Sequence, residues 1–181
     1  MSYQLVFHTE ADSEYREAYQ WHEKEQKGLG SWCLFAFAET GAGFAEQTSL
    51  MLEDIHLETT IPYIDIKRRA GKSNKTAFRP RQIALVGFAL DAFIACPNGF
   101  TDWIDEPDAL ASVLGNFVRD KGLFPSEKHT LYSLRHSFHD RLTDIDTPDH
   151  VQAELMGHTF GRQAYGKGPT LAKKLEWTQK I

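Results

Sequence analysis

The sequence lacks any run of about 18 apolar residues, the length that a membrane-crossing helix needs. Its N-terminus also lacks the basic segment followed by an apolar segment that marks a signal peptide. Cysteine is scarce: Cys33 and Cys96 are the two in the chain, and both stand in apolar surroundings, so we expect buried free thiols rather than a disulfide. These absences predict a cytoplasmic protein with no membrane partner. With 41% hydrophobic residues, the 181-residue chain can bury a core of ordinary size.

An excess of positive charge is lacking too. The chain has 20 basic and 25 acidic residues, a net charge of −5, which by itself argues against a nucleic-acid partner. The distribution is uneven, however, because residues 67–81 carry seven basic and no acidic side chains, whereas residues 1–66 carry three basic and 12 acidic ones. A local basic surface can bind phosphates on an acidic molecule. A solvated, lysine-rich loop is the plain alternative, and composition does not decide between the two.

The spacing of apolar residues predicts a mostly helical chain with one small sheet, an α+β fold. Strands are predicted at residues 60–66 and 82–86, and the basic stretch joins them in a hairpin or small antiparallel sheet. Gly and Pro residues mark the ends of several of the predicted helices. Helices are predicted at residues 10–27, 31–40, 44–52, 88–96, 109–121, 133–143, 148–156 and 170–180.

Five short segments stand in an order that resembles the conserved boxes of tyrosine site-specific recombinases of the phage-integrase kind. No single segment is specific, but the order of all five is, and the resemblance runs from about residue 31 to the C-terminus. It implies the mostly helical catalytic domain of that family, with its small antiparallel β-sheet. The segments are residues 39–46 (ETGAGFAE), 75–85 (KTAFRPRQIAL), 132–138 (YSLRHSF), 155–158 (LMGH) and 165–168 (YGKG).

The resemblance implies DNA strand cleavage and rejoining, for site-specific recombination or integration. Tyr165 would attack a DNA phosphate, forming a 3′-phosphotyrosyl bond and releasing a 5′ hydroxyl. Arg135 would hold the non-bridging oxygens, because its planar fork contacts phosphate bidentately. Lys75 on the hairpin would protonate the leaving oxygen, with Lys72 as its rival. Because the covalent link stores the bond energy, no metal or other cofactor is expected.

Three further residues of these boxes receive expectations. His158 would hydrogen-bond a phosphate oxygen or assist proton transfer. Tyr132 stands where many members of the family have His or Lys, and its phenol would donate a weaker, uncharged hydrogen bond. His136 is expected to pack inside the helix bundle rather than act in catalysis.

The resemblance also implies partners and a domain plan. Residues 31–181 would form the catalytic domain, and residues 1–30 a linker helix left from the connection to a missing core-binding domain. Double-stranded DNA is the expected partner, which would make the protein nucleoid-associated when bound, with self-association into a dimer or tetramer on it. Residues 170–180 would either contact a neighbouring subunit or fold back on their own core. The cations expected to contact DNA are Lys67, Arg68, Arg69, Lys72, Arg79 and Arg81.

One departure from the family pattern bears on activity. Gly43 occupies the position of the arginine in the first box, and no arginine lies between Arg16 and Arg68. Loss of one preorganised donor typically costs about 10²–10³ in rate. The sequence is therefore expected to encode a poor or impaired recombinase, or its alternative, a catalytically inactive DNA-binding remnant of an integrase.

Two other functions are weighed against these. His136, His139 and Asp140 offer metal-binding atoms, but they lack a further ligand at a recognised spacing, so a metal site is not expected. A helical interaction domain unrelated to DNA is the bland alternative, and it predicts no binding to duplex DNA even at low salt.

Overall fold

The computed structural model describes residues 29–67, 80–104, 106–159 and 168–181. Within these ranges the chain forms seven α-helices, two short 3₁₀ helices and three strands. The helix predicted at residues 10–27 lies outside them. The elements are α2 (Leu29–Thr40), α3 (Phe44–Gln47), η1 (Leu52–Asp54), β1 (Ile55–His56), β2 (Tyr63–Ile66), β3 (Arg81–Ala84), α4 (Gly87–Ala95), η2 (Thr101–Trp103), α5 (Pro107–Asp120), α6 (Tyr132–Asp144), α7 (Asp149–Met156) and α8 (Leu171–Thr178).

The predicted α+β fold is confirmed, with differences at the ends of elements. The helix predicted over residues 44–52 ends at Gln47, and a 3₁₀ turn follows after Met51. The strand predicted from residue 60 begins at Tyr63, directly after Pro62, which has no N–H for the ladder. Strand β1 was not predicted, because two residues are too few to show an alternating pattern.

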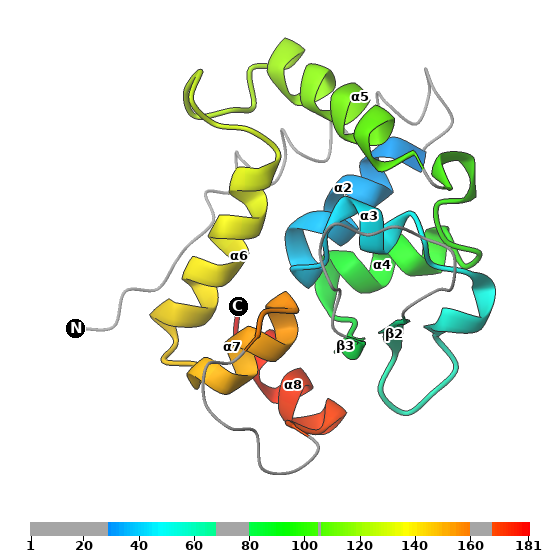
Figure 1. Cartoon of the computed structure of the whole chain (residues 1–181), viewed down its shortest axis with the longest axis vertical. Coiled ribbons are helices and arrows are strands. Elements are labelled where there is room, and N and C mark those ends of the chain that lie inside the picture. The colour runs from blue at the N-terminus through cyan, green and yellow to red at the C-terminus, as the bar shows by residue number, and fades with distance from the viewer. Residues whose placement is uncertain (1–28, 68–79, 105, 160–167) are drawn as a thin grey trace.

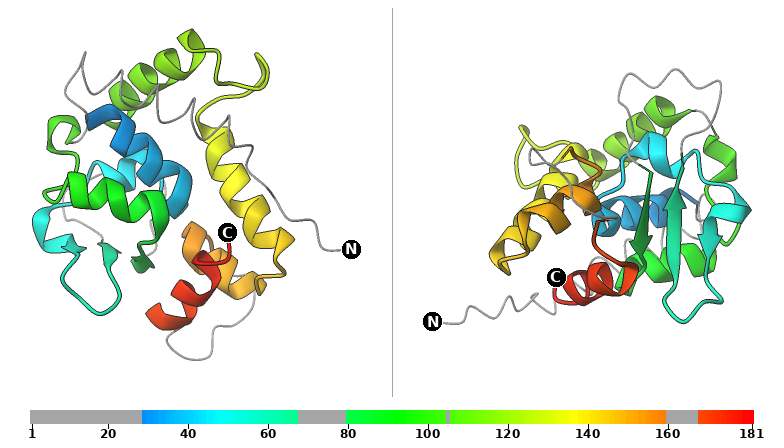
Figure 2. Two further views of the ribbon diagram at one scale, coloured as in Figure 1. Left: turned by 180° about the vertical axis from the view of Figure 1, so that it is seen from behind. Right: turned by 60° about the horizontal axis from the view of Figure 1, so that its bottom comes forward.

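The three strands form one antiparallel sheet in the order β1-β2-β3, seen in the right-hand view of Figure 2. Ile64 pairs with Ile55 on one side and with Ile83 on the other. These isoleucines and Ile66 are buried, while Asp65 between them is partly exposed. The alternation therefore directs one face of the sheet into the core.

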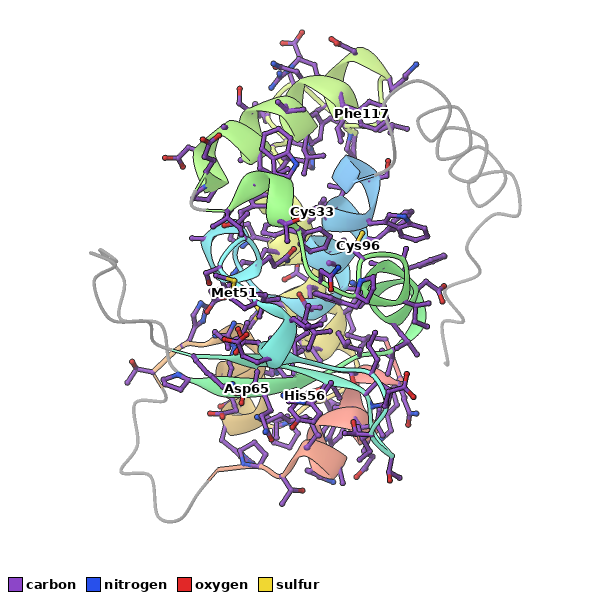
Figure 3. The ribbon with its side chains drawn as sticks, turned by 90° about the vertical axis from the view of Figure 1, so that its right-hand side faces the viewer. Cys33, Met51, His56, Asp65, Cys96 and Phe117 are labelled. Atoms are coloured by element: carbon purple, nitrogen blue, oxygen red, sulfur yellow. The ribbon has the colours of Figure 1, made fainter. Side chains whose placement is uncertain are left out.

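The larger hydrophobic cluster surrounds α2. Residues 33–37 of this helix are all buried, because α4, α5 and α6 pack against different sides of it. Cys33 and Cys96 lie in this cluster as free thiols, as predicted, and burial raises the pKa of Cys33. Figure 3 shows both cysteines among the helices, above the sheet that carries His56 and Asp65.

A second, smaller cluster joins α6, α7 and α8. Its buried members include Phe138 and Leu142 of α6 and Leu155 of α7, with Trp177 of α8 packed against them. Figure 1 shows these three helices on one side of the molecule, with α2, α4 and the sheet on the other. Helix α8 thus folds back on its own chain, and Lys174 bonds the carbonyl of Gln82 in β3 at 2.9 Å.

No helix in the described ranges has the length and apolar character needed to cross a membrane. The same residues contain no group of three or more histidine, cysteine, aspartate or glutamate side chains that could hold a metal ion.

Candidate functional site

The site is built around the C-terminal end of α7, where a glycine reverses the chain. Gly157 has φ of +67°, a left-handed conformation that favours glycine. Its N–H donates to the Glu154 carbonyl at 3.2 Å, and the N–H of His158 donates to the Ala153 carbonyl at 2.8 Å. This pair of bonds is a Schellman motif, and it fixes the position of His158 directly after the helix.

The two carbonyls that remain at this helix end accept from arginines. Arg81 Nε donates to the Leu155 carbonyl at 3.1 Å, and Arg135 Nη2 donates to the Met156 carbonyl at 2.5 Å. Arg135 Nη1 also donates to the carbonyl of Gly41, directly after α2. The last carbonyls of a helix lack partners within it and carry partial negative charge, so guanidinium groups are favoured there. The end of α7 therefore places two arginines from distant segments side by side.

Glu46 of α3 compensates the charge of this pair. Its two carboxylate oxygens accept from Arg81 Nη1 at 2.5 Å and Arg81 Nη2 at 2.8 Å, a bidentate pair in the interior. The same carboxylate lies 3.9 Å from Arg135 Nη1. Arg81 is only 4% exposed and Glu46 3%. Because an unpaired buried charge is costly, removal of either partner should be strongly destabilising.

Gly43 lies at the same place. It precedes α3 with φ of −74° and ψ of 158°, an extended conformation that any residue adopts. Its N–H donates to Glu46 at 2.8 Å, so Glu46 also caps α3. A Cβ atom on Gly43 would lie 3.9 Å from Arg135 Nη1, in ordinary van der Waals contact. A side chain at position 43 would therefore start next to the Arg135 guanidinium.

The electrostatics of Arg135 and Tyr132 follow from this packing. Burial lowers the pKa of Arg135, while the negative charge of Glu46 and a hydrogen bond with Tyr132 raise it. Tyr132 itself is 55% exposed, and its ring meets His136 edge-on, with centroids 5.1 Å apart. The expectation that His136 packs inside is wrong: the residue is exposed, one position past the buried Arg135, because successive helical positions face different directions.

His158 is exposed and lies within the field of these cations. Partial burial lowers its pKa, and the positive charges of Arg135, His139 and Arg81 lower it further, against a smaller opposing effect of Glu46. The imidazole is therefore neutral at pH 7, with one nitrogen able to accept a proton and the other able to donate a hydrogen bond.

The basic stretch divides into parts with different surroundings. Lys67 bonds Asp54 at 2.9 Å and lies 3.6 Å from Asp65, and the hydrogen bond to Asp54 raises its pKa. Arg81, expected at a DNA surface, is instead buried and paired with Glu46. The expected surface position of Arg81 is therefore wrong, because both of its terminal nitrogens bond an internal carboxylate. The remaining predicted residues lie outside the described ranges: Tyr165, Lys75, Lys72, Arg68, Arg69 and Arg79.

Sequence reasoning missed Glu46. A carboxylate is not expected in a site for a phosphate, although Glu46 lies within the first of the five segments. One local signal was present: Glu46 follows Gly43 by three residues, the spacing at which a glutamate caps the start of a helix. Its second role, pairing with Arg81 from 35 residues further along the chain, has no local signal.

Comparisons with known proteins place the fold. The structure is similar to the integrase of transposon Tn1549 in complex with a circular-intermediate DNA, with a TM-score of 0.58 at 13% identity, covering 98% of this chain and 62% of that chain. The same integrase in complex with transposon right end DNA gives 0.58 at 15% identity, covering 97% and 62%. The crystal structure of XerA recombinase gives 0.56 at 14% identity, covering 98% and 60%.

No family model matches the sequence, and no curated protein matches it either. This chain spans about three fifths of the recombinase chains that it resembles in structure. The likeness extends over nearly all of its own length and includes the helices and the small antiparallel sheet predicted from the sequence. The chain has the fold of a tyrosine recombinase catalytic domain.

Proposed function

We propose that residues 31–181 form the catalytic domain of a tyrosine recombinase, which binds double-stranded DNA and cleaves and rejoins it through Tyr165. The observation that carries this proposal is the convergence at the end of α7. Arg135 of α6, His158 after α7 and the first-box position 43 come from three segments of the chain and meet there. These are the segments in which the sequence resembles the family's boxes.

The chemistry requires cationic donors around a phosphate that gains negative charge. In the proposed step the Tyr165 oxygen bonds to phosphorus, the bond from phosphorus to the 5′ oxygen breaks, and a lysine, Lys75 or its rival Lys72, protonates that oxygen. The carbonyls of Gly41 and Met156 orient the Arg135 guanidinium before any substrate binds. A guanidinium has five N–H donors, more than these two carbonyls engage, so the group can also contact phosphate oxygens.

His158 supports the same step in its neutral form. A neutral imidazole can accept the phenolic proton as Tyr165 attacks, or donate a hydrogen bond to a non-bridging oxygen. The cations that lower its pKa keep this form populated at neutral pH. Tyr132, one turn before Arg135 on α6, would add an uncharged donor through its phenolic O–H.

Gly43 favours the second candidate function, a DNA-binding protein without cleavage activity. The first-box arginine is missing, and Arg81, which could be considered as a replacement, has both terminal nitrogens on Glu46. We therefore infer that covalent attachment of Tyr165 to DNA is slow in the natural sequence. DNA binding would remain, together with self-association into a dimer or tetramer on DNA.

Restoring the arginine tests the proposal. We expect Gly43→Arg to raise the rate of covalent attachment to a nicked suicide substrate by roughly 10²–10³-fold, because it returns one preorganised donor. The backbone at position 43 tolerates a side chain, and its Cβ has room. Gly43→Ala is the matched control, since it makes the same backbone change without a charge and should leave the rate unchanged.

Each outcome has a distinct meaning. Attachment that disappears in Tyr165→Phe supports the recombinase. Duplex binding without attachment, in both the natural chain and Gly43→Arg, supports the inactive DNA-binding protein. Absence of duplex binding at low salt contradicts both.

A further inference from the structure

Arg81 is part of the most basic stretch of the sequence, yet its contacts point inward. Its side chain spans three elements: Nε bonds the Leu155 carbonyl of α7, and both terminal nitrogens bond Glu46 of α3, while its own backbone lies in β3. A charged group with 4% exposure gives up most of its hydration. Such a group is retained where it selects one arrangement of the surrounding elements, a role that buried ion pairs can fill.

The guanidinium also lies directly against the turn that carries His158. A Cβ added at Gly157 would come within 2.5 Å of Arg81 Nη1 and 2.7 Å of its Cζ. Only glycine permits this approach, so the Arg81 plane and the Gly157 backbone are in close contact. Together with the hydrogen bond to the Leu155 carbonyl, this contact restrains the last turn of α7.

Charge connects Arg81 to both proposed catalytic side chains. Its positive charge lowers the pKa of Arg135 and the pKa of His158. Glu46 opposes both effects: its carboxylate accepts from Arg81 and from the Gly43 N–H, and it lies 3.9 Å from Arg135. Arg81 and the start of α3 thus share in fixing the position of Glu46 relative to Arg135.

We propose that Arg81 is a positioning residue, which holds the turn of His158 and the Glu46 carboxylate against Arg135, and that it does not contact DNA. This deepens the proposed function, on which its consequence for DNA cleavage rests. The packing role itself concerns described residues alone and can be tested without any reaction.

The experiment compares Arg81→Met, Arg81→Lys and a matched control, Arg141→Met. Arg141 of α6 likewise bonds a glutamate, Glu39 at 2.9 Å, and a helix carbonyl, Ala38 at 3.1 Å, but at the junction with α2. The Arg141→Met variant therefore loses bonds to a carboxylate and to a helix carbonyl, as Arg81→Met does, but none of them involves the turn that carries His158. Methionine keeps the length and apolar stem of arginine without its charge.

Three measurements follow on each variant. In Arg81→Met, the NMR-detected pKa of His158 should rise, because a positive charge that lowers it is removed. Arg141→Met should leave this pKa unchanged. The slope of log binding constant against log salt for duplex DNA should stay the same in Arg81→Met, whereas removing a cation that neutralises a phosphate reduces it by about 0.9. The attachment rate, measured in the Gly43→Arg background, should fall by up to about 100-fold without a decrease in DNA affinity.

Arg81→Lys should recover part of the attachment rate, since lysine keeps the charge near Glu46 but not the fork. A measurement on the wild-type protein does not depend on whether the variants fold. The Nε–H hydrogen of Arg81 should exchange slowly with solvent, and its NMR chemical shift should not change when duplex DNA is added. A shift on DNA addition, or a salt slope lowered by about one with an unchanged His158 pKa, would overturn the proposal. If no protein attaches to DNA, the proposed function fails, while the pKa, salt and exchange measurements still decide the role of Arg81.

Discussion

At the scale of single residues, side chains of the same charge or type take different roles according to their surroundings. Lys67 and Arg81 are the first and last residues of the same basic stretch. Lys67 pairs with Asp54 at a half-exposed position, whereas Arg81 pairs with Glu46 in the protein interior. His136 and His158 are both exposed, and nearby cations lower the pKa of His158. A lowered pKa favours the neutral imidazole at pH 7, whereas His136 contacts the ring of Tyr132.

The lowered pKa of His158 predicts a pH dependence of stability. Below about 6.5 the unfolded chain binds a proton at this residue before the folded protein does. The free energy of unfolding should therefore fall as pH decreases from about 6.5 to the folded-state pKa, and level off below it. Urea titrations between about pH 5 and 8 would show this slope, which should be weaker in His158→Gln. An equal slope in the two proteins would contradict the assignment.

At the scale of elements, the C-terminal end of α7 organises the site. Its last four carbonyls, from Ala153 to Met156, all have partners: two backbone N–H groups of the turn and two arginines. Complete pairing matters because buried helix ends with unpaired carbonyls are unfavourable. The helix end thereby joins β3, α3 and α6 to the histidine that follows it.

A comparison of two glycines tests this arrangement. Gly122 after α5 has φ of +66° and the same pair of reversing hydrogen bonds as Gly157, but nothing lies within 4 Å of its absent Cβ. We expect Gly122→Ala to lower the unfolding free energy by about 1–2 kcal/mol, the cost of a left-handed alanine. Gly157→Ala should cost about 1.5–3 kcal/mol more, because Arg81 must give up a charged hydrogen bond. Equal decreases in urea denaturation would show that the Arg81 contact is unimportant.

At the scale of the whole molecule, two hydrophobic clusters meet across a polar network. The larger cluster surrounds α2 and the smaller one joins α6 to α8. Glu46, Arg81 and Arg135 link elements of one to elements of the other. The candidate site therefore lies where the two clusters join, and its geometry depends on how they are held together.

Charge distribution over the whole molecule leads to a prediction for DNA binding. The net charge of −5 should make the affinity for DNA low, and the number of phosphates that the basic stretch neutralises should set its dependence on salt. Replacing Arg68 and Arg69 by glutamine should lower the slope of log affinity against log salt by up to about 1.8, since each phosphate that is no longer neutralised accounts for about 0.9. Lys67→Gln should change it less, because Asp54 and Asp65 already compensate its charge. Slopes measured by fluorescence anisotropy decide between these outcomes, and a slope unaffected by Arg68 and Arg69 would exclude the basic stretch from the interface.

The sequence by itself determined the α+β fold and the family resemblance, because periodic apolar residues and ordered motifs are local properties of the chain. It also singled out Arg135, His158 and position 43 before their proximity was known. Only the tertiary structure decided that Arg81 turns inward, that Glu46 joins the site and that α8 packs against β3. These outcomes depend on pairings between residues 35 to 92 positions apart, and nothing in the local sequence specifies the partner of a buried charge.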